Sequence, residues 1–247
     1  MLQNAVTLEN ISKRFTDEPG KPLHVLENIN LEVREGEFFV ILGPSGSGKS
    51  TLLRIASGLD QSYEGRVRFE SSTEERKTSF VFQQFALLPW LTVYENVGMG
   101  LTGARLSPPE KRARIGQELE MLHLAKFAAR YPRELSGGMK QRVGLARALA
   151  ADPKIIFMDE PFSELDSFTA DELRKELLEI WEKRKPTIVM ISHNIEEALQ
   201  LADRIAVLSK IPARIERIIE NGLPRPRERR SAAFYEKEDF LASLIKP

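Results

Sequence analysis

The chain of 247 residues is long enough for one large domain or two small ones, and its 42% hydrophobic and 29% charged residues are typical of a globular protein. Its 36 basic and 36 acidic residues give zero net charge, so no overall field attracts nucleic acid or an anionic membrane. The absence of cysteine excludes disulfides, thiolate zinc sites and cysteine nucleophiles. Without a long apolar run or a secretory signal pattern, we expect an intracellular protein with no membrane span.

The first third of the chain predicts sheet. Apolar and polar side chains alternate over residues 6–8, 29–33 and 67–69, as they do in half-buried strands. Turn-forming residues are concentrated over 17–22, which predicts an exposed loop.

Four continuous apolar runs predict strands that are buried on both faces of a parallel sheet. They lie at 38–42, 155–158, 188–191 and 205–208. Between them we expect helices, one starting at Ser107 with Glu110 three residues later, one over about 138–150, and one over about 169–185 that Pro186 ends. This order of elements predicts an α/β fold.

The composition changes at Leu223, where a basic, proline-rich stretch over 224–230 begins. We therefore expect a domain boundary near 222 and a loosely attached tail over 223–247. The basic stretch could contact nucleic acid, but a solvated tail is the simpler interpretation.

A glycine-rich loop follows the apolar run 38–42 and precedes an expected helix. Its residues are Gly43, Pro44, Ser45, Gly46, Ser47, Gly48, Lys49, Ser50 and Thr51. Such a loop wraps a phosphate chain with its backbone N–H groups, and the following helix adds its positive end. We expect Lys49 to reach the β- and γ-phosphates of a nucleotide and the Ser50 hydroxyl to bind Mg²⁺.

Other polar side chains follow expected strands. Asp159 and Glu160 end the run 155–158, Gln83 follows another apolar segment, and His193 follows the run 188–191. The carboxyl ends of parallel strands form the ligand-binding edge of an open sheet. Asp159 is the candidate Mg²⁺ ligand, and Glu160 is the candidate to orient or deprotonate an attacking water.

A second anion site is predicted where Ser136, Gly137 and Gly138 open the expected helix 138–150. It follows no strand and has no lysine comparable to Lys49. A capped helix start is the alternative interpretation.

Taken together, these motifs resemble those of ABC transporter ATP-binding subunits over about residues 1–222. The resemblance rests on the phosphate loop, Gln83, residues 135–142, 158–161 and 163–166, and Ser192-His193. It implies a P-loop NTPase parallel-sheet core, an antiparallel β subdomain, and a helical subdomain inserted at about 84–150. It also implies binding of ATP and Mg²⁺ and hydrolysis of ATP.

The resemblance further implies a head-to-tail dimer, expected here to be a homodimer, with ATP between the phosphate loop of one subunit and Ser136-Gly137-Gly138 of the other. By the same resemblance, Glu160 is the catalytic base and His193 steadies the attacking water and the γ-phosphate. Gln83 senses Mg²⁺ and the γ-phosphate, and Asp166 lies in a loop at the dimer interface.

The resemblance also places Phe15 where an aromatic side chain stacks on adenine. Three residues depart from the family pattern: Phe15 replaces a tyrosine, Glu164 replaces a small residue, and Asn194 replaces an aspartate after the histidine. None of these departures removes a catalytic group.

Three segments, 83–97, 213–215 and 223–227, are similar to those of importers of nitrate, sulfonate, taurine and bicarbonate. This branch implies a separate permease and an extracytoplasmic solute-binding protein. We expect the apolar residues 88–91 to be exposed and to contact the permease. We expect a peripheral subunit at the cytoplasmic face of the cell membrane, with no nucleic-acid partner. The alternatives are a soluble ABC-superfamily ATPase that acts on ribosomes or DNA, and a nucleotide-binding regulator without enzymatic activity.

Overall fold

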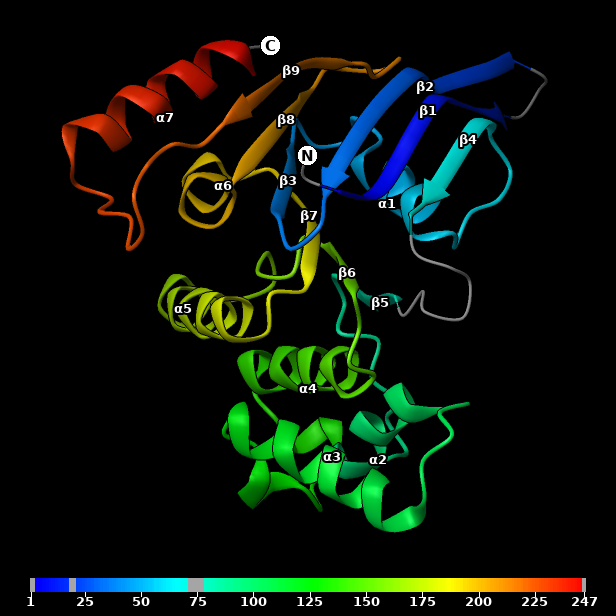
Figure 1. Cartoon of the computed structure of the whole chain (residues 1–247), viewed down its shortest axis with the longest axis vertical. Coiled ribbons are helices and arrows are strands. Elements are labelled where there is room, and N and C mark those ends of the chain that lie inside the picture. Colours follow the sequence, from blue (N-terminus) through cyan, green and yellow to red (C-terminus); the bar gives the residue numbers. More distant parts are fainter. Residues whose placement is uncertain (1–2, 18–20, 71–77, 246–247) are drawn as a thin grey trace. The chain divides into compact units, whose positions relative to one another are not determined.

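The computed structural model describes residues 3–17, 21–70 and 78–245 and divides the chain into two compact units (Figure 1). Unit 1 comprises 1–75 and 187–247, and unit 2 comprises 76–186. The predicted α/β fold is confirmed, with parallel strands in both units.

An antiparallel three-stranded sheet lies in unit 1. Its strands are β1 (Asn4–Asp17), β2 (Lys21–Arg34) and β4 (Glu64–Phe69), in the order β2-β1-β4. The sequence prediction of strands at 6–8, 29–33 and 67–69 is confirmed. The predicted loop is wrong at both ends, since Asp17 pairs with Lys21 inside the hairpin, and residues 18–20 lie outside the described residues.

A second sheet of unit 1 places β3 (Phe38–Leu42) between β7 (Thr187–Ser192) and β8 (Arg204–Leu208), all three parallel. The last strand, β9 (Ile215–Glu220), pairs antiparallel with β8. Every residue of β3, β7 and β8 is buried, which explains why these strands are continuous apolar runs.

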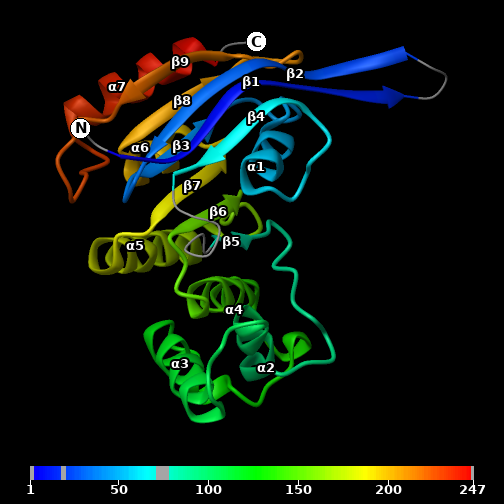
Figure 2. The same cartoon turned by 45° about the vertical axis from the view of Figure 1, so that its right-hand side comes forward.

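Three helices complete unit 1: α1 (Lys49–Ser57), α6 (Ile195–Leu201) and α7 (Ala232–Leu244). Within the unit α1 contacts β7, α6 contacts β3 and β7, and α7 lies beside α6 (Figure 2). Because α7 buries Phe234 and Leu241, the expectation of a loosely attached, solvated tail is wrong.

Unit 2 contains a parallel pair of strands, β5 (Thr78–Val81) and β6 (Ile155–Asp159). Its helices are α2 (Val93–Gly98), α3 (Pro108–Met121), α4 (Gly137–Ala150) and α5 (Ser167–Arg184), with 3₁₀ turns η1 (Met99–Leu101), η2 (Ala125–Phe127) and η3 (Pro132–Glu134). The start of α3 is as predicted, because the Glu110 carboxylate accepts hydrogen bonds from the N–H and the hydroxyl of Ser107 at 2.7 and 2.6 Å. The predicted helices over 138–150 and 169–185 are confirmed as α4 and α5.

Candidate functional site

The glycine-rich loop of unit 1 runs from the end of β3 into α1, whose first residue is Lys49. The lysine side chain is buried, with 4% of its surface exposed, and its Nζ donates to the carbonyl oxygens of Gly43 at 3.0 Å and Pro44 at 2.8 Å. The ammonium group is thus held inside the curve of the loop, at the position where a phosphate chain would be wrapped.

Two glycines allow this curve. Gly46 and Gly48 have φ of 77° and 88°, in the left-handed region that favours glycine. A Cβ on Gly48 would lie 2.7 Å from Cγ1 of Val25, so the loop and β2 approach too closely for a side chain. On Gly46 a Cβ would meet no described atom within 4 Å, which leaves that side of the loop open to a ligand.

The first turn of α1 fits an anion. Among the described residues, no side chain caps this helix, and its first turn holds no acidic residue. The hydroxyl of Ser47 is buried and has no hydrogen-bond partner within the described part of the chain. Backbone N–H groups at a helix start, a lysine and an unsatisfied hydroxyl suit a polyphosphate.

His193 lies at the same edge of the unit 1 sheet as the phosphate loop. Leu42 of β3 pairs with Ser192 of β7, so Gly43 and His193 are the next residues along two neighbouring parallel strands. The imidazole side chain is exposed. The structure therefore brings together the predicted phosphate loop and the predicted histidine of unit 1 at one sheet edge.

The polar residues of unit 2 lie at the end of its own strand pair. Val81 of β5 pairs with Met158 of β6, so Gln83 and Asp159 follow at the same edge. Asp159 is buried, whereas Glu160 is partly exposed and has φ of 43°, a left-handed conformation that costs a non-glycine residue about 1 kcal/mol.

Ser163 connects Glu160 and Gln83, and the sequence did not indicate it as a site residue. Its hydroxyl donates to the carbonyl oxygen of Glu160 at 2.9 Å and accepts from Nε2 of Gln83 at 3.3 Å. A serine three residues after an expected strand end is a signal for such a local turn. The bond orients the Gln83 amide relative to the backbone of Glu160.

The segment that follows Gln83 is also fixed by residues that the sequence analysis missed. Phe85 and Ala86 have φ of 55° and 46°, and Arg147 of α4 donates to their carbonyl oxygens at 3.0 and 2.6 Å. Burial lowers the pKa of the Arg147 guanidinium. A single arginine thus holds a strained turn two residues beyond Gln83.

The expected permease-binding segment 88–91 is exposed only in part. Pro89 and Trp90 are exposed, Trp90 by 70%, whereas Leu88 and Leu91 are half-buried, so the expectation that all four are exposed is wrong. The backbone of this segment is held by the buried amide of Asn96, which donates to the carbonyl oxygens of Leu88 at 3.1 Å and Leu91 at 3.0 Å.

At the start of α4, the Ser136 hydroxyl accepts a hydrogen bond from the N–H of Met139 at 3.3 Å and is exposed. Gly138 is buried, and a Cβ there would lie 2.4 Å from Cγ2 of Thr169 in α5. Gly137 has room for a side chain, since its nearest side-chain atom would be Cδ2 of Leu165 at 3.7 Å. Of these two glycines, Gly138 is the one that packing within the described chain requires.

Asp166 is the N-cap of α5 and accepts a hydrogen bond from the N–H of Thr169 at 3.0 Å. This hydrogen bond lowers the pKa of Asp166 below its usual range. The cap gives Asp166 a structural role within its own chain, in addition to the interface role that the resemblance implies.

Phe15 lies on β1 opposite Leu23 of β2, and its ring is 43% exposed. Nζ of Lys13 lies 5.0 Å from the ring centroid, within the range of a cation–π contact. An exposed ring with a cation on one side leaves a surface on which a base could stack.

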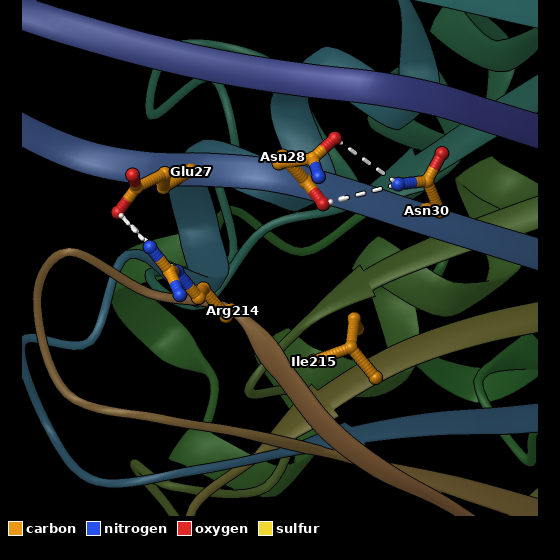
Figure 3. Close-up of a pocket in the computed structure, with 5 residues that line it drawn as sticks. All are labelled: Glu27, Asn28, Asn30, Arg214 and Ile215. Carbon is orange, nitrogen blue, oxygen red and sulfur yellow. Dashed lines mark hydrogen bonds and ion pairs between the residues drawn. The ribbon is translucent and has the colours of Figure 1, made fainter.

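A cleft of about 450 Å³ in unit 1 holds none of the predicted site residues (Figure 3). Its lining residues are Glu27, Asn28, Asn30, Arg214 and Ile215. Arg214 and Glu27 form an ion pair at 3.0 Å, and the Asn30 amide donates to the carbonyl oxygen of Asn28 at 3.1 Å. These groups bond to one another, so the cleft is a poor candidate for a ligand site.

Residues 26–163 match the family model described as ABC transporter. The aliphatic sulfonates import ATP-binding protein SsuB of Bacillus cereus is 42% identical over 234 residues, which cover 94% of this chain and 92% of that protein. The bicarbonate transport ATP-binding protein CmpD of Synechococcus elongatus is 43% identical over 228 residues, or 90% of this chain and 82% of that protein.

Among solved structures, a dimeric ATP-binding cassette in a post-hydrolysis state with ADP and Pi is similar, with a TM-score of 0.77. It is 38% identical, and the match covers 87% of this chain and 98% of that chain. Within the part of the chain that the structure describes, no helix is both long and apolar enough to cross a membrane.

Proposed function

Because the chain belongs to the ABC transporter family, binds ATP and hydrolyses it, we propose that it is the ATPase subunit of an importer for a small solute of the nitrate, sulfonate, taurine or bicarbonate class. The phosphate loop carries the proposal: Lys49 is held among loop carbonyls at the open start of α1. The similarity to sulfonate and bicarbonate import proteins over most of the chain supports the importer branch and disfavours a soluble ATPase that acts on ribosomes or DNA.

In this proposal, the phosphate loop and Lys49 bind the phosphates of ATP, and Phe15 stacks on its base. Ser50, Asp159 and Gln83 would hold Mg²⁺, a hard cation that takes one or two carboxylates together with substrate phosphates. When bound there, Mg²⁺ neutralises charge on the β- and γ-phosphates.

Glu160 accepts a proton from the attacking water as general base, and His193 orients that water and the γ-phosphate. The left-handed backbone at Glu160 and the Ser163 bond to its carbonyl oxygen restrict the position of the carboxylate. Most of the acceleration would then come from positioning and from charge stabilisation.

The exposed Ser136 and the adjacent Gly137 at the start of α4 would contact the ATP of a second copy of this chain, with Asp166 at the interface. The exposed Trp90 and Pro89 would contact a separate permease. The subunit would then lie at the cytoplasmic face of the membrane. A solute-binding protein outside the membrane would deliver the solute to that permease.

The first test is turnover by a variant that lacks the proposed base. Glu160→Gln should keep its affinity for ATP and lose about 100- to 10,000-fold in the rate of hydrolysis, since general-base catalysis is worth that much. Glu172→Gln, which changes an exposed carboxylate on α5, is the matched control and should hydrolyse ATP at the wild-type rate. Normal steady-state turnover by Glu160→Gln would reject the assignment of the base.

The second test identifies the partner. Tagged Glu160→Gln is expressed in the native cell, membranes are extracted in mild detergent with ATP and Mg²⁺, and copurifying proteins are identified by mass spectrometry. We expect a multi-span permease, and the binding protein encoded beside it would identify the solute. Recovery of ribosomal or DNA-associated proteins without a membrane protein would contradict the importer function.

A further inference from the structure

Arginines of the C-terminal segment, residues 223–247, form hydrogen bonds with the C-terminal end of α6. Nη1 of Arg227 donates to the carbonyl oxygens of Leu199 at 3.0 Å and Gln200 at 2.9 Å, and Nη2 of Arg225 donates to that of Leu201 at 2.5 Å. These carbonyls belong to the last turn of α6, where a helix has no backbone donors of its own left to bond them. Two cations therefore lie at the negative end of the helix dipole, where they are favourable.

Three arginines of the basic stretch 224–230 contact α6 and are partly shielded from solvent. Arg225, Arg227 and Arg229 are half-buried, whereas the adjacent Arg230 is exposed. Arg229 adds an ion pair with Glu196 of α6 at 2.8 Å. Burial lowers the pKa of Arg227 to about 10, so its side chain still carries a positive charge at neutral pH.

The other end of α6 directly follows His193. Asn194 is the N-cap and accepts from the N–H of Glu197 at 3.1 Å, and the buried Glu197 carboxylate accepts from the hydroxyl of Ser192 at 2.5 Å. The sequence neighbours of His193, Ser192 and Asn194, are therefore both bonded to the first turn of α6. We therefore expect a displacement of that turn to move the backbone of His193 as well.

A helix of seven residues is about 10 Å long and is not stable by itself in water. Its position therefore depends on its packing against β3 and β7 and on the contacts that hold its two ends. The first end is held by Ser192 and Asn194, next to His193. The second end is held by Arg225 and Arg227, together with the buried Asn221 amide, which donates to the carbonyl oxygen of Leu199 at 2.8 Å. Because the helix has only seven residues, we expect a change in the contacts at one end to reach the other.

We propose that Arg225 and Arg227 are positioning residues that fix His193 for ATP hydrolysis by holding the C-terminal end of α6. The inference rests on the proposed function only in giving His193 a role in the reaction. The C-terminal segment then contributes to ATP hydrolysis. Its removal lowers the rate of turnover and does not weaken nucleotide binding.

The chain contains three histidines, so an NMR spectrum of the full-length protein with labelled imidazoles resolves His193 against two internal references, His24 and His123. In Arg227→Gln we expect the His193 signal to shift or broaden while the His123 signal stays in place. Arg227→Lys, which retains a cation at the helix end, should restore most of the wild-type signal. Arg230→Gln is the matched control and should leave all three signals unchanged.

Kinetics separate positioning from loss of fold. Arg227→Gln should lower kcat about 10- to 100-fold, the cost of a misplaced group, and leave KM for ATP within about twofold. In a His193→Ala background the same substitution should cause no further fall in kcat. Arg225→Gln, which leaves Arg227 in place but removes the ion pair of Arg225 with Asp203, is the second variant if Arg227→Gln folds poorly.

An unchanged His193 signal in both Arg225→Gln and Arg227→Gln would overturn the inference, as would equal losses of kcat with and without His193. Either result leaves the ATPase function standing. Normal turnover by His193→Ala would instead remove the proposed role of His193 and overturn the inference with it, whatever the NMR spectra show.

Discussion

At the scale of single residues, Lys49 is the central side chain of the proposed phosphate site. The loop carbonyls of Gly43 and Pro44 hold its ammonium group at hydrogen-bond distance, which compensates for burial of the charge. A phosphate would replace these carbonyls with a charged acceptor, and charged hydrogen bonds are the stronger ones.

Lys49→Ala should therefore weaken ATP binding by about 1.5 to 3 kcal/mol, or about 10- to 150-fold in Kd. Isothermal titration calorimetry with ATP measures this directly. Lys154→Ala, which removes an exposed lysine before β6, should bind ATP as the wild type does. Equal affinity of the Lys49 variant and the wild type would contradict the role of the loop.

Some residues of the candidate site could not be predicted from the sequence. Lys49 and Asp159 are found from the sequence because glycine spacing and a strand end point to them. Ser163, Asn96 and Arg147 act through bonds to backbone carbonyls, and a sequence pattern does not reveal which carbonyl a side chain reaches. The left-handed backbone at Glu160 is likewise invisible, because glutamate carries no preference for it.

At the scale of elements, burial decides what a sequence predicts. The strands β3, β6, β7 and β8 are buried along their whole length, so their apolar runs are unambiguous. The strand β9 is mostly exposed on the sheet edge and its sequence shows no such run. The packing of the C-terminal segment is hard to predict because many of its contacts are made by arginines, whose bonds to α6 replace the apolar burial that pattern analysis detects.

A carboxylate buried between helices is a further feature that the sequence pattern does not reveal. Glu118 lies on the same face of α3 as Ile115 and is fully buried, with an ion pair to Arg184 of α5 at 3.0 Å. Its second carboxylate oxygen has no hydrogen-bond partner among the described residues. Burial raises the pKa of Glu118 above its ordinary value of 4.5, despite the opposing effect of the Arg184 hydrogen bond.

This raised pKa predicts a pH dependence of stability. Between pH 4.5 and the higher folded-state pKa, the folded protein binds more protons at Glu118 than the unfolded chain, so its contribution to stability is complete below that window and is lost as pH rises through it. Relative to Glu118→Gln, the wild type should gain stability as pH falls toward 4.5. Urea unfolding at a series of pH values measures the difference, and Glu120→Gln, an exposed change on the same helix, should show no such trend.

At the scale of the whole molecule, the sequence predicts a phosphate loop and a separate anion site at the start of α4. The latter has an exposed serine and no acidic residue in its first turn, within the described part of the chain. Packing explains Gly138, which approaches Thr169, but it does not explain Gly137, where a side chain would fit. A requirement from outside the chain would account for the second glycine, and the phosphates of an ATP bound to a partner subunit would supply it.

Ser136→Arg in the Glu160→Gln background should therefore bind ATP normally as a monomer and fail to dimerise when ATP is added, because the bulky cation blocks the face that meets the partner's nucleotide. Ser136 also caps α4 through Met139, so Ser136→Ala is the matched control that loses the cap without adding bulk. Light scattering with and without ATP distinguishes them: dimers are expected for Ser136→Ala and monomers for Ser136→Arg. If both variants dimerise with ATP, this anion site belongs to the helix cap alone and the two-subunit site has to be built from other residues.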